Sequence, residues 1–335
     1  MVQDFNQLTP VGRLRRLRAM AWDVVADYPF EAVRLRAMTD STNGIFRVDT
    51  SSGDRYVLRI GMAPPAGKTS ERTLSELEWL ADLAGRPEIT VPSPIKNSSG
   101  SLVSSHSFPG IPEARTCCVF SWLEGPLLAE RLSEDTMRAY GAAMARLHTA
   151  SLDFAPSPTF VAPRYTSVYP FDAPFNLLKQ AGPDILPPRR RTVYSEAIER
   201  IEDWFAALPD TGPIRMIHGD LHGWNAKILR GRVSIFDFED QMWGWPVQDI
   251  GTAFYYLWGS DDFDRRCWWF REGYEGVAEW PDPKGREVPL MLVARSLLLG
   301  NDVLNQPEWM SEAPGVFERG ERRISEMMAG RVIAA

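Results

Sequence analysis

His218-Gly-Asp-Leu-His-Gly-Trp-Asn225, followed by Ile235-Phe-Asp-Phe-Glu-Asp240, is the strongest structural signal in this chain. Within it, Asp220 and Asn225 have the spacing of the pattern H-R-D-x-x-x-x-N, the loop that carries the catalytic aspartate in phosphoryl transfer. Asp237 follows Asn225 by twelve residues and ends a short apolar run. A strand end that follows a polar loop in this way predicts that the three side chains serve one site.

The three side chains suit phosphoryl transfer, in which the protein supplies positioning and charge neutralisation rather than covalent chemistry. The pattern assigns Asp220 to orient or deprotonate an acceptor hydroxyl. It assigns Asn225 and Asp237 to hold Mg²⁺ beside ATP, because magnesium prefers hard oxygen ligands. Each residue taken alone is more simply a turn or hairpin cap. Their combination between apolar strands favours a site that uses ATP and Mg²⁺.

The same stretch resembles the aminoglycoside phosphotransferase and choline kinase family, whose usual form is H-G-D-L-H-x-x-N followed by I-D-F-x-D. Downstream, residues 244–253 (Gly-Trp-Pro-Val-Gln-Asp-Ile-Gly-Thr-Ala) resemble the family segment G-x-x-x-x-D-L-A. The resemblance implies an α+β fold that is bilobal and protein-kinase-like, with a small antiparallel-sheet N-terminal lobe and a larger, mainly helical C-terminal lobe. It also implies an ATP-dependent O-phosphotransferase.

Departures from the protein-kinase pattern narrow the acceptor that we expect. Gly219 replaces the arginine of H-R-D, Glu239 replaces the glycine of D-F-G, and no A-P-E follows. We therefore expect transfer of the γ-phosphate to a hydroxyl of a small molecule, such as an aminoglycoside-like antibiotic or an amino alcohol. A protein Ser/Thr kinase and a nucleotide-binding pseudo-enzyme on the same scaffold are the alternatives.

Four further residues are expected to support the catalytic loop. We interpret His218 and His222 as hydrogen-bonding partners of the loop backbone, and His222 as poorly placed for proton relay to the aspartate two residues before it. Asp240 is expected to support the metal ligands from a second layer. Asp249 precedes an apolar helix expected at residues 250–258. It either caps that helix or, as the resemblance implies, buttresses the catalytic loop.

Composition agrees with an enzyme large enough for two hydrophobic cores. The 335 residues are 44% hydrophobic and 24% charged, and the net charge of −7 argues against a nucleic-acid surface, which needs a basic patch. No apolar run reaches the roughly 18 residues that span a membrane, and the first residues lack a signal pattern. The three cysteines form no C-x-x-C, so a reducing, cytoplasmic setting is expected. The oligomeric state stays open.

The first third of the chain, residues 1–120, is expected to form the nucleotide lobe. Apolar and polar residues alternate over 33–38, 45–49 and 55–60, which predicts three antiparallel strands joined by tight turns. The first turn would cover the phosphates, and small side chains would let its backbone amides approach them. Its residues are Ser41, Thr42, Asn43 and Gly44. The alternative is a plain hairpin turn.

Arg59 lies where the pattern V-A-I-K places a phosphate-binding lysine, and arginine can contact phosphate through two donors. A helix is predicted over residues 69–84, with a stop at Gly85. On that helix Glu76 lies nearer the apolar face than Glu78, so Glu76 is the expected partner of Arg59. The alternative is that these charged side chains are solvated.

Residues 121–126 are predicted to form a hinge, and residues 127–335 the helical lobe with the acceptor site. A buried strand over 117–123 leads into the hinge, where the backbone of Ser121, Trp122 and Leu123 would bind adenine. This prediction depends on the kinase-like fold, because recognition by backbone groups leaves almost no trace in a sequence.

Within the helical lobe, periodicity predicts helices at 133–151 and 194–208, and a short strand at 214–217 that feeds the catalytic loop. Residues 157–191 are expected to pass irregularly over the acceptor site, or to be a plain connection. Residues 260–280 interleave acidic and aromatic side chains, and the family resemblance places acceptor contacts there. Such a cleft would suit a cationic amine or a sugar. The alternative is a solvated helix face with aromatic core residues.

Overall fold

The computed structural model describes residues 5–39, 43–61, 69–171, 174–208, 214–330 and 333. The chain forms two compact units. Unit 1 comprises residues 1–124 and 155–161, and unit 2 comprises residues 125–154 and 162–335. The chain first passes from unit 1 to unit 2 after Glu124, within the segment predicted as the hinge.

Unit 1 is built on an antiparallel sheet of order β1-β2-β3-β6-β4, with β5 also paired to β6. The strands are β1 (Ala32–Thr39), β2 (Gly44–Thr50), β3 (Arg55–Ile60), β4 (Pro94–Ile95), β5 (Ser104–His106) and β6 (Arg115–Ser121). The strands predicted at 33–38, 45–49 and 55–60 are confirmed as β1, β2 and β3. The strand predicted at 117–123 is β6, which begins two residues earlier and ends at Ser121. Along β2, buried and half-buried residues alternate, because one face of the strand covers a core.

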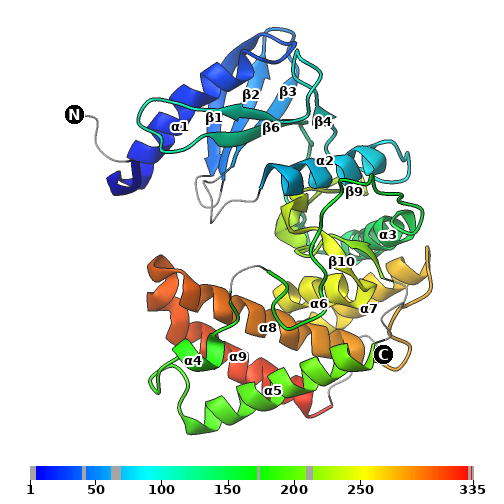
Figure 1. Ribbon diagram of the computed structural model, residues 1–335. Coiled ribbons are helices and arrows are strands. Elements are labelled where there is room, and N and C mark those ends of the chain that lie inside the picture. Colours follow the sequence, from blue (N-terminus) through cyan, green and yellow to red (C-terminus); the bar gives the residue numbers. More distant parts are fainter. Residues whose placement is uncertain are drawn as a thin grey trace. The chain divides into compact units, whose positions relative to one another are not determined.

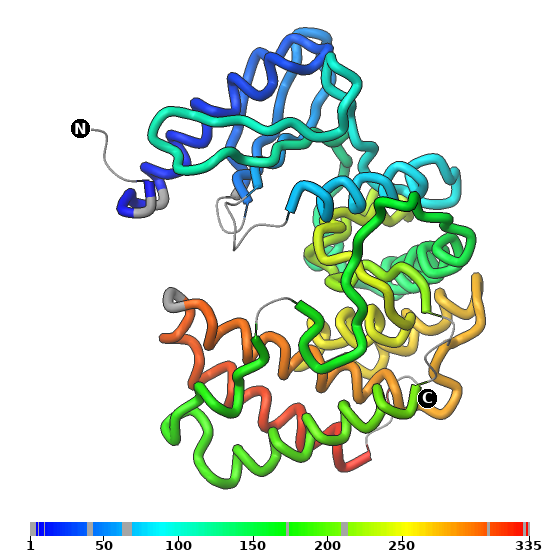
Figure 2. The backbone as a smooth tube through the Cα atoms, viewed as in Figure 1, coloured from blue at the N-terminus to red at the C-terminus, as the bar shows by residue number. Residues whose placement is uncertain are grey.

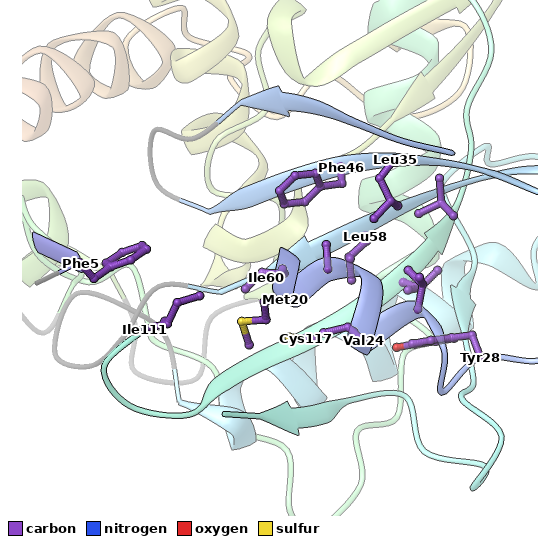
Figure 3. Close-up of a cluster of buried hydrophobic side chains, with 14 residues drawn as sticks. Phe5, Met20, Val24, Tyr28, Leu35, Phe46, Leu58, Ile60, Ile111 and Cys117 are labelled. Carbon is purple, nitrogen blue, oxygen red and sulfur yellow. The ribbon is translucent and has the colours of Figure 1, made fainter. Parts of the chain in front are cut away.

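A helix that the sequence analysis did not identify, α1 (Pro10–Val25), covers this core. Thr9 caps the helix by accepting a hydrogen bond from the Gly12 amide, and proline occupies the first helical turn, where no hydrogen bond is lost. The core side chains come from the helix, the strands and the loop before β6, as Figure 3 shows. They include Met20, Val24, Leu35, Phe46, Leu58 and Ile111.

The helix α2 (Ser70–Ala84) is the one predicted after the third strand. Thr69 caps it by accepting from the Arg72 amide, and Gly85 follows its last residue. Its buried face carries Leu77, Leu80 and Leu83, which follow one another at three-residue steps. Glu76 is buried beside them.

Residues 155–161 belong to unit 1, although they were predicted as part of the helical lobe. The Ser157 amide and hydroxyl both donate to the carboxylate of Glu78, at 2.6 and 2.7 Å. The Val161 amide donates to the hydroxyl of Ser75 at 2.8 Å. These bonds hold the segment beside α2, where Figure 2 traces it in green along the cyan helix. The prediction failed because it assigned the chain to lobes in sequence order.

Unit 2 is mainly helical, and α5, α8 and α9 pack against one another (Figure 1). Its helices are α3 (Glu134–Ala150), α4 (Leu177–Gln180), α5 (Pro188–Ala207), α6 (Pro246–Leu257), α7 (Phe263–Glu275), α8 (Glu287–Asn305) and α9 (Ala313–Met328). Two small antiparallel pairs complete it: β7 (Arg215–Ile217) with β10 (Met242–Gly244), and β8 (Ala226–Leu229) with β9 (Arg232–Ile235). Among the described helices, none combines the length and apolarity needed to cross a bilayer.

The helices predicted at 133–151 and 194–208 correspond to α3 and α5. The start of α5 was predicted too late, because the helix begins at Pro188, which suits a first helical turn since it needs no amide donor there. Residues 188–191 therefore belong to a helix and not to the irregular connection.

Helices α3 and α7 approach each other through a pair of glycines. A Cβ atom on Gly141 of α3 would lie 1.9 Å from the Phe270 carbonyl oxygen, and one on Gly273 of α7 would lie 1.9 Å from the Arg138 carbonyl oxygen. Any larger residue at either position would force the two backbones apart. This close contact fixes α3, which in turn contacts the catalytic loop.

Candidate active site

The β8–β9 hairpin brings the two predicted metal ligands to one of its ends. Its two-residue turn consists of Arg230 and Gly231. Both have positive φ, 51° and 78°, as a type I′ turn requires. The register pairs the first residue of β8 with the last residue of β9. Just beyond that pair, the Phe236 amide donates to the Asn225 carbonyl at 3.0 Å. Asn225 and Asp237 therefore lie on adjacent segments of the chain.

Asp237 occupies an unusual backbone conformation. Its φ and ψ are 68° and 63°, in the left-handed region that non-glycine residues seldom adopt. Aspartate and asparagine tolerate this region better than other side chains, and strained backbone of this kind gathers at functional sites. The side chain is exposed, so its carboxylate is accessible to a ligand.

Both oxygens of the Asp220 carboxylate have partners. The Asn225 amide nitrogen donates to Oδ2 at 3.1 Å and to the Asp220 carbonyl at 2.9 Å. Nη2 of Arg295, a residue of α8, donates to Oδ1. Burial by itself would raise the pKa of Asp220, but the Arg295 guanidinium and the neighbouring His222 hold that pKa well below its usual range. Asp220 is therefore a carboxylate throughout the neutral range.

Asp249 binds the backbone of the catalytic loop. Its Oδ2 accepts from the His218 amide at 2.9 Å and its Oδ1 accepts from the Gly219 amide at 2.8 Å. The residue is fully buried. The capping alternative is wrong, because the helix expected at 250–258 is α6, which begins at Pro246 and includes Asp249 in its first turn.

A second buried chain of contacts holds Asp249 in turn. His148, on the buried face of α3, lies with Nε2 3.0 Å from Asp249 Oδ2 and Nδ1 3.0 Å from the Tyr274 hydroxyl. Because a carboxylate only accepts, the Nε2 proton of His148 points to Asp249. On the same helix, the Tyr140 hydroxyl donates to the Leu221 carbonyl of the catalytic loop at 2.9 Å.

His218 lies in the loop as a neutral hydrogen-bonding group. Its Nε2 donates to the Phe236 carbonyl at 3.0 Å and its Nδ1 accepts from the Asp220 amide at 3.3 Å. Burial lowers the pKa of His218 below its ordinary value. The ring thus links the catalytic loop to the residue before Asp237, and it makes the backbone contacts expected from the sequence.

Gly219 has a structural reason to replace the arginine of H-R-D. Its φ is +81°, and a Cβ atom there would lie 2.2 Å from the Asp240 carbonyl oxygen. The loop can therefore pass the turn that holds Asp240 only with glycine at this position. Asp240 itself ends the 3-10 turn that follows Asp237, and its side chain is half-buried.

His222 lies beside Asp220, although the sequence indicated that it would be poorly placed for proton relay to that residue. Its Nδ1 accepts from the Trp224 amide at 3.2 Å, so Nε2 carries the proton of the neutral ring, and this atom lies 3.4 Å from Asp220 Oδ2. The prediction failed because the loop curls into a 3-10 turn after His222. The imidazole also packs on Tyr256 of α6, with 4.0 Å between ring centroids.

In unit 1, Arg59 pairs with Glu76, the partner that helical periodicity indicated. The two guanidinium Nη atoms donate to the two carboxylate oxygens at 2.8 and 2.6 Å, and both residues are buried. Glu78 binds Ser157 instead. A bidentate, buried pair of this kind fixes the arginine more tightly than a lysine could be fixed.

The first two residues of the predicted hinge have backbone amides that are already hydrogen-bonded. The Ser121 amide donates to the Ser93 carbonyl at 2.9 Å, and the Trp122 amide donates to the Arg55 carbonyl at 3.2 Å. These two amides already have partners within unit 1, so neither is available to donate to adenine.

The predicted phosphate turn is only partly described. Gly44 begins β2 and pairs with Ile60 of β3, and Asn43 directly precedes it. Ser41 and Thr42 lie outside the described residues.

The region 260–280 has a buried aromatic side and an exposed acidic side. Tyr274 and Trp280 are buried, and their rings form an edge-to-face pair with 5.5 Å between centroids. Glu272 forms an ion pair with Arg138 of α3 at 2.9 Å. The alternative interpretation, a helix with an aromatic buried side, therefore describes these residues better than an acceptor cleft.

The donor set fits a hard divalent cation. The side-chain nitrogen of Asn225 faces Asp220, so the side-chain oxygen of Asn225 points away from Asp220. The Asp237 side chain is exposed at the same end of the hairpin. Among the described residues, no group of three or more His, Cys, Asp or Glu side chains could hold a metal by itself. A site with one carboxylate and one amide is typical of magnesium that is completed by substrate phosphates and waters.

Three residues around the catalytic loop were missed by the sequence analysis. Arg295 carried a signal, because it is the single charge in the apolar run 290–300, and a charge buried in such a helix needs a partner. His148 follows Met144 at a four-residue step on the apolar face of α3, a position that indicates burial. Tyr256 gave no signal beyond its place in an aromatic helix.

Comparison with known proteins agrees with this geometry. A solved amicoumacin kinase, in complex with AMP-PNP and Ca²⁺, superimposes with a TM-score of 0.77 at 18% identity, covering 93% of this chain and 95% of that one. A microcompartment-associated aminopropanol kinase gives 0.74 at 19% identity, over 93% and 98%. A spectinomycin phosphotransferase in complex with ADP and spectinomycin gives 0.62 at 14%, over 93% and 98%. No curated protein matches the sequence significantly.

These similarities establish the fold, and the sequence itself establishes the family. The model of the phosphotransferase enzyme family matches residues 37–281, which include Arg59, the catalytic loop and Asp249. The predicted α+β, bilobal, protein-kinase-like fold is confirmed. The chain belongs to the phosphotransferase enzyme family, and its predicted activity as a phosphotransferase is confirmed.

Proposed function

We propose that Asp220 is the catalytic residue through which this chain phosphorylates a hydroxyl of a small molecule. In the transfer, the acceptor oxygen forms a bond to the γ-phosphorus as the bond from that phosphorus to the bridging oxygen of ADP breaks. The proton of the hydroxyl passes to Asp220. The observation that carries the proposal is the convergence of Asp220, Asn225 and Asp237 through direct hydrogen bonds and one hairpin register.

Asp220 suits orientation more than strong base catalysis. Arg295 and His222 keep its pKa well below the usual range despite burial, so its affinity for a proton is low. A loose transition state needs little deprotonation of the acceptor before the phosphoryl group departs. We therefore assign Asp220 to align the hydroxyl in line with the γ-phosphate and to receive its proton late.

Asn225 and Asp237 are proposed as the residues that hold Mg²⁺. When bound, the ion would neutralise charge on the phosphates. The protein's part is to fix the two oxygen donors: Asn225 through its bond to Asp220, and Asp237 through the hairpin end. Asp240, His218, His222 and Asp249 keep these segments in place.

On the nucleotide side, Arg59 is proposed to contact the phosphates, with Glu76 as its tether. This pair reproduces the lysine–glutamate pair that protein kinases need for activity. Asn43 and Gly44, together with Ser41 and Thr42, are proposed to cover the phosphates with backbone amides. The segment Ser121 to Leu123 is proposed to bind adenine through its backbone, without the amides of Ser121 and Trp122.

The acceptor is proposed to be a hydroxylated amine, either an amino alcohol or an aminoglycoside-like antibiotic. The names of the similar structures, an aminopropanol kinase and an amicoumacin kinase, support this class. A cytoplasmic location, where ATP is available, belongs to the same proposal.

The test is magnesium-dependent ADP release across a panel of candidate acceptors: spectinomycin, hygromycin B, amicoumacin, 1-amino-2-propanol, choline and homoserine. Asp220→Asn is the control, because it preserves shape and hydrogen bonding to Asn225 while it removes the charge. One acceptor should stimulate the wild type at least about 100-fold over the variant, the lower end of what a single acid–base group contributes. Equal stimulation of both proteins would refute the role of Asp220.

A further inference from the structure

Arg295 is a buried cation in an otherwise apolar stretch of α8. The residue is 5% exposed, and its neighbours along the helix are alanine, valine, serine and leucine. Charges are almost never buried to this degree unless they are paired, because desolvation costs several kcal/mol per ion. The position of Arg295 therefore has to be explained by what its guanidinium contacts.

The guanidinium contacts the catalytic aspartate. Its Nη2 donates to Asp220 Oδ1 and also to the Tyr256 hydroxyl at 3.2 Å, and the guanidinium carbon lies 5.7 Å from the centroid of the Tyr256 ring. Burial alone would lower the pKa of Arg295, but the charge of Asp220 holds that pKa above its ordinary value. The two groups therefore form an ion pair at neutral pH.

We propose that Arg295 is a positioning residue for phosphoryl transfer, which holds the Asp220 carboxylate in one orientation for the acceptor hydroxyl. This proposal rests on the proposed role of Asp220. It adds a residue that lies outside the matched family region, because Arg295 follows residue 281.

The geometry gives each carboxylate oxygen a distinct task. Oδ1 is held by Arg295, and Oδ2 faces the Asn225 amide and the His222 ring. A carboxylate offers about four lone-pair positions, so a place remains for the acceptor hydroxyl. Without Arg295, Oδ1 would lose its partner and the carboxylate could rotate, and a misplacement of 1 Å can reduce a rate about 100-fold.

Several other groups influence Asp220, and the test has to separate them from Arg295. His218 and Asn225 come from its own loop, as does His222, and Tyr256 comes from α6. Two carboxylates, Asp240 and Asp302, act on the same region, and burial raises the pKa of Asp302. These groups stay in place when Arg295 alone is changed.

The first experiment measures the free energy of unfolding by urea at pH 7.5. The proteins are the wild type, Arg295→Met, Asp220→Asn and the double variant. In Arg295→Met the Asp220 carboxylate loses its cationic partner and leaves an uncompensated charge in the folded protein, which is strongly destabilising. Asp220→Asn removes that charge, so the double variant separates the loss of the pair from the loss of packing.

The expected result is that Arg295→Met loses much more stability in the wild-type background than in the Asp220→Asn background. An equal loss in both backgrounds would mean that Arg295 only fills space, and would overturn the proposal. This experiment needs no acceptor, so it remains decisive if the panel finds none.

The second experiment measures ADP release with the most active compound of the acceptor panel. Arg295→Met should reduce kcat about 100-fold with little change in the KM for ATP, because a carboxylate that can rotate misplaces the acceptor hydroxyl. Arg295→Lys, which keeps the charge without the planar fork, should retain more activity. It also serves if the methionine variant fails to fold. Unchanged kcat in both variants would overturn the proposal.

A matched control is Arg190→Met. Arg190 of α5 pairs with Glu321 of α9 at 2.8 Å in the same unit and is also mostly buried, so its loss removes a comparable ion pair away from Asp220. The failures are distinguishable. If Asp220→Asn keeps activity, the proposed function fails. If Asp220→Asn is inactive while Arg295→Met resembles Arg190→Met in kcat and in the KM for ATP, only the role of Arg295 fails.

Discussion

Asp237 combines a predicted ligand role with a left-handed backbone, and the two can be tested separately. Asp237→Asn keeps a side chain that tolerates this conformation, and Asp237→Gly removes the carboxylate while it relieves the strain. Both variants should lose at least about 100-fold in magnesium-dependent activity, whereas the glycine variant should be as stable as the wild type or more so. Activity and thermal unfolding are measured on the same samples. A glycine variant with near-normal turnover would refute the ligand assignment.

His218 gives the site a predictable sensitivity to acid. Burial depresses the pKa of His218 below 6.5, the ordinary value for histidine. The folded protein therefore keeps the ring neutral while the unfolded chain takes up a proton. Its contribution to stability is present above pH 6.5 and is lost as the pH falls toward the depressed value. The difference in unfolding free energy between the wild type and His218→Asn should therefore shrink from pH 7.5 to pH 5.5. A difference that grows on acidification would contradict this account.

At the scale of elements, the glycine contact between α3 and α7 supports the catalytic loop from behind. Gly141→Ala should destabilise unit 2 by about 2–3 kcal/mol, because the new methyl group overlaps the Phe270 carbonyl oxygen, although alanine favours a helix. Gly182→Ala is the control, since a Cβ atom there meets nothing within 4 Å. Urea unfolding measures both. Equal stability of the two variants would show that the helices can separate without cost.

Elements near one another in sequence could be predicted, and those that depend on distant contacts could not. Helical periodicity was sufficient to choose Glu76 over Glu78, because both lie on one helix with a clear apolar face. The same reasoning placed the start of α6 too late, because an aspartate just before an apolar helix resembles an N-cap. The bonds of Asp249 to the loop amides depend on distant contacts that the local sequence does not show. The contact of Arg295 with Asp220 joins positions 75 residues apart, and no local pattern encodes it.

The two units differ in how much of their structure could be predicted from the sequence. In unit 1 the first three strands and the capped helix α2 were predicted, but α1 was missed, and residues 155–161 return to the unit from later in the chain. Unit 2 depends on helix packing: Phe270 and Tyr274 are buried because α7 lies against α3, whereas Trp268 is exposed. The motif identified the chemistry and left the acceptor open, since binding contacts are spread over distant segments.

The most direct test of the central claim is to identify the phosphorylated product. The wild type is incubated with Mg²⁺, ATP and the acceptor that best stimulates ADP release, and the products are examined by ³¹P NMR and mass spectrometry. The account predicts one new phosphate monoester on a hydroxyl of that acceptor, formed in step with ADP and absent with Asp220→Asn. Release of inorganic phosphate without any phosphorylated acceptor, or product formed equally by the variant, would contradict it.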